Sequence, residues 1–347
     1  MSGLLPLHFR IEEEAIIQTV KHLRKQLTYD DFTYQADQYE QLVLPTALHP
    51  ALKGIGVKIL SNTAEDEPAS NVKIYTDGSR IEDNVGCSFI VTIENGVIHT
   101  WQAHLQSNNS VFQSEVVAIK HAIDYLINMK IPTGIILTDS LSSLHALVNP
   151  DHRSTIIQDI QRTVRDHQSK NYYLKWVKAH VGNAGNELAD QMAKEAAVNS
   201  NVLNLTIPWP YSHLKRITRL RAISKWQQQW DSSPTGRRTA FHIAYVDPDR
   251  NIGNSLLIRY IRGHGPFPTY FARHGISNSD MCVCGSQGTP EHYVTTCQLT
   301  AGQHLLIPYT NTQAYCKYLI KQSHLVRKIC AIMSKLSSLG TDLCQSA

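Results

Sequence analysis

Apolar and polar side chains alternate along several short segments in the middle of the chain. A period of two places every second side chain on the same face of an extended backbone, so these segments are predicted to be strands. The dipeptide Asn95-Gly96 lies between two of them and is typical of a tight hairpin turn. The predicted strands cover residues 72–76, 85–93, 97–105 and 172–179, and the apolar run GIILT (134–138) is predicted as a short buried strand.

Between and after these strands, apolar residues recur every three or four positions, which is the spacing of one helix face. In the longest such segment this face is formed by Val116, Ile119, Ile123, Leu126 and Ile127. The predicted helices cover residues 112–129, 140–148, 154–167 and 184–198. The order of three strands, a helix, a strand, two helices, a strand and a helix predicts an α/β fold, a mixed five-stranded sheet with helices on its faces.

The segments on either side of this block follow other patterns. A helix is predicted over residues 9–27, and residues 28–71 show no sustained period. After Pro208-Trp209-Pro210, helical spacing returns over residues 212–230 and again over about 313–339. We therefore expect three parts, a helical connector over residues 1–70, an α/β domain over 71–199 and a basic helical region over 211–347.

Composition narrows the class of protein. The chain has 347 residues, which suggests two domains. No apolar run approaches the ~20 residues of a membrane-spanning helix, and the N-terminus lacks the basic stretch and apolar core of a secretory signal. Seven Cys are an odd number, and three of them cluster with a His, which suits a reducing compartment. We expect an intracellular protein of the cytoplasm or nucleus, neither secreted nor membrane-bound; no oligomeric state is indicated.

The formal charge of +4 is unevenly distributed. Residues 211–262 carry 10 basic and 3 acidic side chains, a balance of +7, whereas residues 1–71 carry 6 basic and 10 acidic ones. A concentration of cations is typical of a surface that binds nucleic-acid phosphates. On charge alone, a solvated amphipathic helix explains the segment equally well.

Four acids lie at the ends of the predicted elements. Asp77 caps the first strand, Glu115 lies in the first turn of the first long helix, Asp139 ends the fourth strand and Asp190 lies on the last helix. Each alone has an ordinary alternative as a turn residue, helix-start charge, N-cap or surface acid. Together they can converge, and grouped carboxylates need cations to offset their repulsion. Two Mg²⁺ or Mn²⁺ ions suit such oxygen ligands and would promote phosphodiester hydrolysis.

The same elements carry TDGS on the first strand, the Glu of FQSEVVAI, TDS after the fourth strand, and the terminal WVKAHVGNAGNELADQMAKEAA. With these motifs, residues 72–198 resemble a type 1 ribonuclease H domain. The resemblance implies a ribonuclease H-like sheet and Mg²⁺-dependent, endonucleolytic hydrolysis of the RNA strand of an RNA–DNA hybrid. Asp77, Glu115, Asp139 and Asp190 match the family's four metal-binding carboxylates.

The resemblance also implies roles for neighbouring residues. His180 matches a catalytic loop His that assists proton transfer or product release, and Glu187 matches an auxiliary acid near the metals. The basic handle that some relatives carry is absent between residues 148 and 154. Substrate contacts are expected from Gly78, Ser79, Gln113 and Ser114.

A second cluster lies near the C-terminus, where Cys282, Cys284, His292 and Cys297 form a C-x-C-x7-H-x4-C pattern. Three thiolates and an imidazole can complete a tetrahedral, structural Zn²⁺ site. One residue between the first two Cys is fewer than the usual two to four, so four unrelated loop residues are the alternative.

The flanking regions carry a resemblance of their own. Residues 259–297 resemble the region after the ribonuclease H domain in polyproteins of non-LTR (LINE-type) retrotransposons, and the start GLLPLHFRIEEEA resembles the connector that follows their reverse transcriptase. Two hypotheses follow: an active hybrid ribonuclease derived from such an element, or a catalytically inactive remnant that binds nucleic acid.

Overall fold

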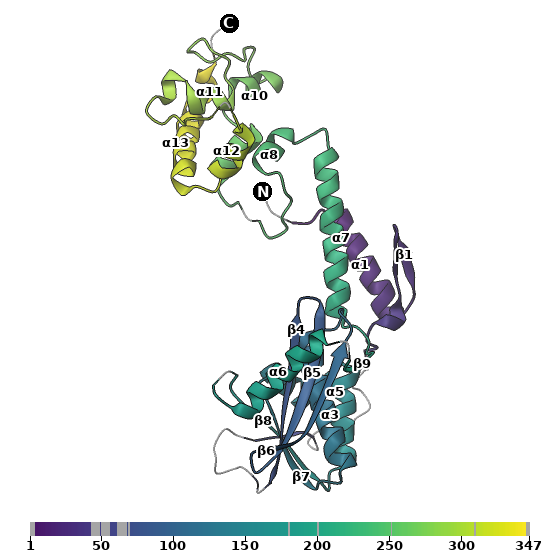
Figure 1. Ribbon diagram of the computed structural model, residues 1–347. Coiled ribbons are helices and arrows are strands. Elements are labelled where there is room, and N and C mark those ends of the chain that lie inside the picture. Colours follow the sequence, from purple (N-terminus) through teal and green to yellow (C-terminus); the bar gives the residue numbers. More distant parts are fainter. Residues whose placement is uncertain are drawn as a thin grey trace. The chain divides into compact units, whose positions relative to one another are not determined.

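The structure is a computed structural model (Figure 1). It describes residues 4–42, 49, 56–60, 68, 70–179, 181–199, 201–250, 252–308 and 310–344. The chain divides into two compact units, one formed by residues 15–218 and the other by residues 1–14 with 219–347. The division falls within two helices, α1 (Leu7–Ile17) and α7 (Tyr211–Ser232). None of the described helices combines the length and apolar character needed to cross a membrane.

A seven-stranded mixed sheet forms the centre of the first unit, in the order β3-β8-β7-β4-β5-β6-β9. β4, β5 and β6 form an antiparallel meander, and the remaining neighbours pair in parallel. The strands are β3 (Lys58–Leu60), β4 (Val72–Ile81), β5 (Asn84–Ile93), β6 (Gly96–Leu105), β7 (Thr133–Thr138), β8 (Asn171–Trp176) and β9 (Leu203–Leu205).

Helices cover both faces of this sheet (Figure 1). They are α3 (Val111–Asn128), α4 (Leu141–Val148), α5 (Thr155–Asp166) and α6 (Ala184–Val198). Because successive strand residues point to opposite faces, Phe89 and Val91 of β5 enter the core shared with α3, while the Ser88 hydroxyl donates to the Ala189 carbonyl of α6 at 2.7 Å. Burial on both faces explains why β5 is buried almost from end to end.

The contact between β5 and α6 depends on small residues. A Cβ on Gly86 would overlap the backbone of Ala193 and Ala197, so only glycine fits at this position. The facing side of α6 is correspondingly made of alanines, four of which are buried. This close approach fixes the helix that carries Asp190 against the sheet.

The connector residues of the first unit pack against the start of α7. Ile16, Val20, Tyr34 and Tyr39 form a small apolar core with Leu214 and its neighbours. The connector contains a π-helical turn (Gln18–His22), the hairpin β1 (Leu27–Tyr29) and β2 (Phe32–Tyr34), and a 3₁₀ turn (Ala36–Gln38). The helix expected over residues 9–27 therefore ends early, and the segment without a period contains short strands.

The second unit is helical and has a core of its own, which includes Tyr260, Phe267, Tyr293, Ile332 and Met333. Its helices are α8 (Arg237–His242), α9 (Ser255–Arg262), α10 (Pro268–Arg273), α11 (Pro290–Thr295), α12 (Thr312–Leu319) and α13 (Ser323–Leu339), with 3₁₀ turns at Gln298–Thr300 and Gly340–Leu343.

The five predicted strands are the five central strands of the sheet, with ends shifted by a few residues. The edge strands β3 and β9 are additional and correct the expected count to seven. Each has only three residues, which is too short to show a period in the sequence.

Candidate active site and metal centres

Three of the four predicted acids meet at one point in the first unit. One carboxylate oxygen from each of Asp77, Glu115 and Asp139 lies within 4.8 Å of the other two. Asp77 is on β4, Glu115 is on α3, and Asp139 directly follows β7, the parallel neighbour of β4. Residues 62 positions apart are thus brought together by strand pairing and by a helix packed on the sheet.

The position of Asp77 differs from the expectation. It does not cap its strand but lies in the middle of β4, opposite Ser88 of β5, because the hairpin continues to Ile81. The following Gly78 is what lets α3 approach. A Cβ there would lie 2.5 Å from both the Glu115 backbone nitrogen and the Ser114 hydroxyl. Gly78 therefore has a packing role that the motif alone did not reveal.

The acids repel one another in a desolvated place. Burial raises the pKa of Asp77 to about 7, and the charges of Asp139 and Asp190 add to the shift. Burial, followed by the charges of Asp77 and Asp139, also raises the pKa of Glu115 well above its ordinary value. Without a counter-charge, these carboxylates therefore resist ionising together at neutral pH.

One atom of the cluster has no partner. The Oε2 atom of Glu115 is buried and accepts no hydrogen bond from the residues that the structure describes. A buried carboxylate oxygen without a donor is costly. A divalent cation among these oxygens would satisfy it and offset the repulsion, so the residues fit the oxygen-ligated Mg²⁺ or Mn²⁺ expected from the sequence.

Asp190 lies outside the group of three but close enough for its charge to raise the pKa of Asp77 and of Glu115. Its Oδ2 atom accepts a hydrogen bond from Lys194 Nζ at 2.6 Å. On the same helix, Asn186 Nδ2 donates to Asp139 Oδ2 at 3.2 Å. The sequence analysis did not predict Asn186 and Lys194 as site residues. Each lies four positions from Asp190, which places all three on one face of α6 and could have indicated them.

The remaining predicted residues have different surroundings. His180 lies outside the described residues. Glu187 is exposed and its Oε1 accepts the Gly182 N–H at 3.1 Å. Ser79 is half-buried on β4.

Gln113 and Ser114 are buried and their side chains are used within the fold. Gln113 forms a capping box with Ser110 and also donates to Glu40 at 2.5 Å, and the Ser114 hydroxyl donates to the Val111 carbonyl. These bonds stabilise the start of α3, the helix that presents Glu115. Substrate contact by Gln113 and Ser114 stays a prediction beside these roles in capping and packing.

The comparison with family models decides the nature of this part of the chain. The model for RNase H matches residues 69–198, the stretch that holds all four acids. Residues 69–198 are an RNase H domain. The α/β class, the mixed sheet and the helices on its faces that the sequence predicted are thereby confirmed.

Similar proteins come from retroelements. The chain is 29% identical over 132 residues to a Pol polyprotein of the type-1 retrotransposable element R1 2 of Nasonia vitripennis, covering 35% of this chain and 28% of that protein. It is 29% identical over 93 residues to the R1 polyprotein of Bradysia coprophila, covering 25% and 9%. The chain thus spans less than a third of the length of these relatives.

Two solved structures align with about the same share of the chain. One is the foamy viral protease-reverse transcriptase in complex with an RNA/DNA hybrid, at 16% identity and a TM-score of 0.33, covering 40% of this chain and 22% of that one. The other is RNase H1 of the archaeon Halobacterium salinarum, at 17% identity and a TM-score of 0.31, covering 37% and 97%.

Outside the RNase H domain, the predicted Cys and His residues also meet. One ligand atom from each of Cys282, Cys284, His292 and Cys297 lies within 4.8 Å of the others. The Cys282 and Cys297 sulfurs are 3.8 Å apart, close to the edge of a tetrahedron with Zn–S bonds of about 2.3 Å. Cys284 Sγ lies 3.1 Å from His292 Nε2. Four unrelated loop residues would not converge in this way.

The surroundings of this cluster suit a soft cation. Burial raises the pKa of Cys297 to about 12, with the neighbouring Cys282 adding to the shift. At Cys284, burial is outweighed by hydrogen bonds, first from the Ser286 backbone, and its pKa is lowered. His292 Nδ1 lies 3.1 Å from the Thr296 hydroxyl, which leaves Nε2 to face the sulfurs. The donor set therefore fits a structural Zn²⁺.

Proposed function

We propose that this chain hydrolyses the RNA strand of RNA–DNA hybrids endonucleolytically, as the ribonuclease H part of a retrotransposon-derived protein. The observation that carries the proposal is the convergence of Asp77, Glu115 and Asp139 to within 4.8 Å inside the RNase H domain, with a buried Glu115 oxygen left without a partner. The similarity to R1 polyproteins supports the retroelement origin.

In this proposal, Asp77, Glu115, Asp139 and Asp190 hold two Mg²⁺ or Mn²⁺ ions. The ions would activate a water molecule and stabilise the leaving oxygen of the phosphodiester. Asn186 positions Asp139 through their hydrogen bond, and Lys194 holds Asp190 until metal binds. Glu187 serves as an auxiliary acid. His180 assists proton transfer or product release. His180→Ala should lower turnover by about 10²–10⁴-fold if the His transfers a proton, and by less if it only aids release.

Nucleic-acid contacts near the active site are proposed on a second observation. Arg80, three residues after Asp77 on β4, lines a cavity of about 350 Å³ together with Asn108, His213 and Arg216. Arg216 belongs to the basic segment 211–262. Arg80 also donates to the Ser107 and Asn109 carbonyls, and Asp83 lines the same cavity. Two guanidinium groups against one acid still suit a phosphate of the hybrid. Gly78, Ser79, Gln113 and Ser114 remain proposed substrate contacts.

The Cys/His cluster is proposed to bind one structural Zn²⁺. Its ligands come from a single segment of 16 residues, Cys282 to Cys297, in the second unit. The metal would join the loop before α11 to the helix and the turn after it. Its contribution would be to stability and to the shape of this unit, and no step of hydrolysis is assigned to it.

The decisive experiment is digestion of an end-labelled RNA–DNA hybrid beside duplex RNA and duplex DNA of the same sequence, with and without Mg²⁺. The proposal requires cleavage of the RNA strand of the hybrid only, dependent on the metal. Binding of the hybrid without cleavage would instead establish the alternative, a catalytically inactive remnant that binds nucleic acid.

A further inference from the structure

The basic segment 211–262 does not present all its cations to solvent. Arg219 donates to Glu13 at 3.3 Å, and Glu13 is only 4% exposed. Lys225 donates to Glu12 at 3.1 Å. These two cations of α7 are thus neutralised by acids of α1 within the second unit. A surface that binds phosphate in this unit must be sought elsewhere.

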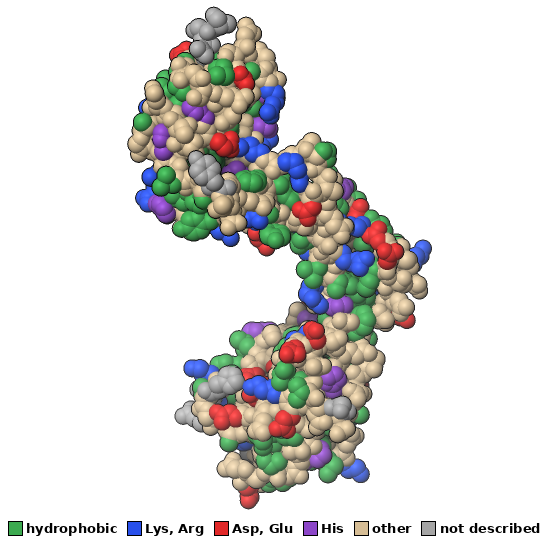
Figure 2. Space-filling view, turned by 45° about the horizontal axis from the view of Figure 1, so that its top comes forward, with side chains coloured by type: hydrophobic (Ala, Val, Ile, Leu, Met, Phe, Trp, Pro, Cys, Tyr) green, Lys and Arg blue, Asp and Glu red, His purple; other side chains and the backbone are tan. Residues whose placement is uncertain are grey.

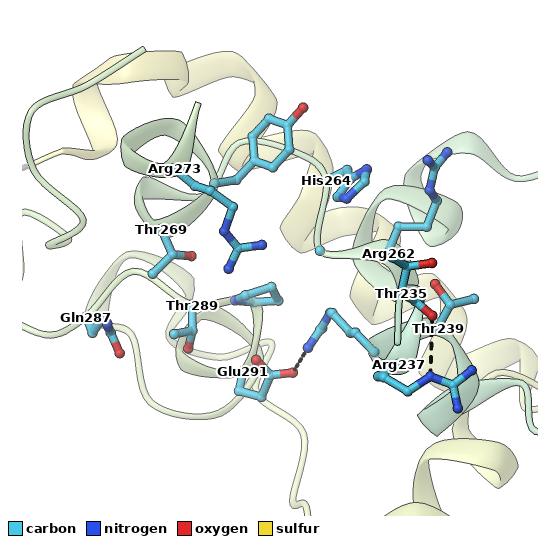
Figure 3. A pocket seen from close by; sticks show the side chains of 15 residues that line it. Thr235, Arg237, Thr239, Arg262, His264, Thr269, Arg273, Gln287, Thr289 and Glu291 are labelled. Atoms are coloured by element: carbon cyan, nitrogen blue, oxygen red, sulfur yellow. Dashed lines mark hydrogen bonds and ion pairs between the residues drawn. The ribbon is translucent and has the colours of Figure 1, made fainter. Parts of the chain in front are cut away.

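A cavity of about 730 Å³ in this unit is lined by several other basic side chains. Figure 3 shows its walls, which come from the start of α8, the end of α9, α10, and the loop that leads into α11. Four Arg and one His line it against a single acid, Glu291. The basic side chains are Arg237, Arg238, Arg262, His264 and Arg273.

Two of these guanidinium groups are fixed by the protein itself. Arg238 forms an ion pair with Glu291 and donates to the Tyr260 carbonyl, and Arg237 donates to backbone carbonyls at the end of α7 and to Thr235. Arg238 and Glu291 therefore neutralise each other. They join two of the walls but contribute little net charge to the cavity.

The other two are available. Arg262 and Arg273 have no acceptor or acidic partner among the described residues, and Figure 3 shows the Arg273 guanidinium extending between the walls toward Thr269 and Thr289. His264 lies close enough to Arg262 and Arg273 for their charges to act on it. Burial is the main cause of its lowered pKa, and these two charges add to the shift. On the face drawn in Figure 2, basic side chains are scattered among acidic and apolar ones.

We propose that this cavity is a phosphate-binding site that takes the backbone of a single nucleic-acid strand, with Arg262 and Arg273 as its principal ligands. Arg262 and Arg273 line one cavity from two helices, and such planar guanidinium groups are suited to bidentate recognition of phosphate. The volume lies within the range of ligand-binding clefts and exceeds what one phosphate needs. Naming nucleic acid as the source of the phosphate rests on the proposed function.

The Cys/His cluster has a defined relation to this site. The wall formed by Gln287, Thr289 and Glu291 lies between Cys284 and His292 in the sequence. The segment is further tied to α10, because the Gly288 carbonyl accepts a hydrogen bond from the Thr269 hydroxyl at 3.0 Å. Metal at the cluster would therefore hold one wall of the cavity in place.

The test measures binding of a short labelled single-stranded DNA to the full chain by fluorescence anisotropy, at several salt concentrations. This DNA contains no RNA to cleave, so the result is independent of nuclease activity. The double variant Arg262→Gln with Arg273→Gln should weaken binding at least about tenfold. Its plot of log affinity against log salt should be less steep by about 1.4, the value for two lost contacts to a single strand.

The matched control is Arg327→Gln with Lys328→Gln, which removes the same charge from exposed positions of α13 in the same unit and should bind as wild type does. Arg273→Lys, which retains the charge, should recover part of the affinity if Arg273→Gln loses it. Equal weakening in the control pair, or unchanged affinity and salt slope in the Arg262/Arg273 pair, would overturn the proposal. A further measurement is the binding of pyrophosphate by calorimetry. If pyrophosphate binds in the cavity but the affinity for the strand does not depend on Arg262 and Arg273, the proposal is also overturned.

Discussion

Each of the two units contains a group of side chains that could hold a metal ion, and the two groups are assembled in opposite ways. The acids of the RNase H domain come from β4, α3 and the end of β7, and they meet only because the whole sheet is folded. The Cys/His cluster is local, with all four ligands within 16 residues. The first site is thus a product of the fold, whereas the second can help to make its fold.

The comparison also concerns chemistry. The carboxylates are hard oxygen ligands with raised pKa values, which makes the metal-free acid site electrostatically unfavourable. With a metal bound, the three sulfurs and the imidazole would fill all four positions of a tetrahedron and leave none for a substrate. Removing metal should therefore abolish activity at the first site and lower stability at the second.

The largest effect is expected from Asp77→Asn. The substitution removes a metal ligand with almost no change of volume, so hydrolysis of the hybrid should fall by at least about 10²-fold while the fold is kept. Initial rates on a labelled hybrid and a thermal unfolding curve measure the two quantities. Asp159→Asn, at an exposed position of α5, is the control and should retain the wild-type rate. A fully active Asp77→Asn chain would remove this acid from the site.

The second effect separates the two clusters. Cys297→Ser, or removal of zinc, should lower the stability of the second unit by several kcal/mol, since a ligand at about 1,000 times its Kd contributes about 4 kcal/mol. Zinc content by elemental analysis and thermal unfolding provide the measurements. Cys330→Ser, outside the cluster, should leave both unchanged. If the purified chain contains no zinc and Cys297→Ser unfolds as wild type does, the cluster has no metal.

The third prediction concerns how the repulsion and burial of the acids make stability depend on pH. In buffer free of divalent ions, the unfolding free energy of wild type should fall as pH rises from about 4 to about 7, relative to Asp77→Asn. The folded pKa of Asp77 is about 7 against an ordinary 3.8, so the folded chain keeps a proton that the unfolded chain loses. The stability that this proton contributes is fully present below the unfolded pKa of 3.8 and is lost as pH rises through the folded pKa of about 7. Urea titrations at several pH values, repeated with Mg²⁺, measure it; parallel curves for the two chains would contradict it.

The smallest effect concerns Lys194. Its ammonium group pairs with Asp190 and adds a positive charge near the carboxylates. Lys194→Gln should lower the Mg²⁺ concentration for half-maximal rate by about two- to fivefold, which is the scale of a partly exposed ion pair. Lys120→Gln breaks a similar pair with Asp124 on α3 and serves as the control. A raised Mg²⁺ requirement in Lys194→Gln would show that the lysine supports metal binding.

The parts of the fold that the sequence predicted are those with repeated side-chain spacing. β5, β6 and α3 are long enough for alternation or helical spacing to appear, and the acids on them follow from motif order. β3 and β9 have three residues each and gain their conformation from pairing with β8 and β6. Such strands carry no local signal, because the partner that orders them is distant in the sequence.

The site was predictable in its acids and less so in their supports. Asp77, Glu115 and Asp139 stand in recognisable motifs, whereas the capping box of Gln113 and the packing role of Gly78 depend on how closely α3 approaches β4. That distance is a property of the folded sheet. The same limit applies to the cavity around Arg262 and Arg273, which lie on two different helices of the second unit.

The close contact at Gly86 limits which residues relatives of this chain can carry at that position. Because a Cβ there would overlap the backbone of α6, the space cannot be recovered by trimming a neighbouring side chain. A larger residue would have to displace the helix, and Asp190, one turn before Lys194 on α6, would move with it. Position 86 offers no ligand or reacting group, yet it is expected to tolerate substitution no better than the acids themselves. A survey of active variants should find glycine there as consistently as aspartate at position 77.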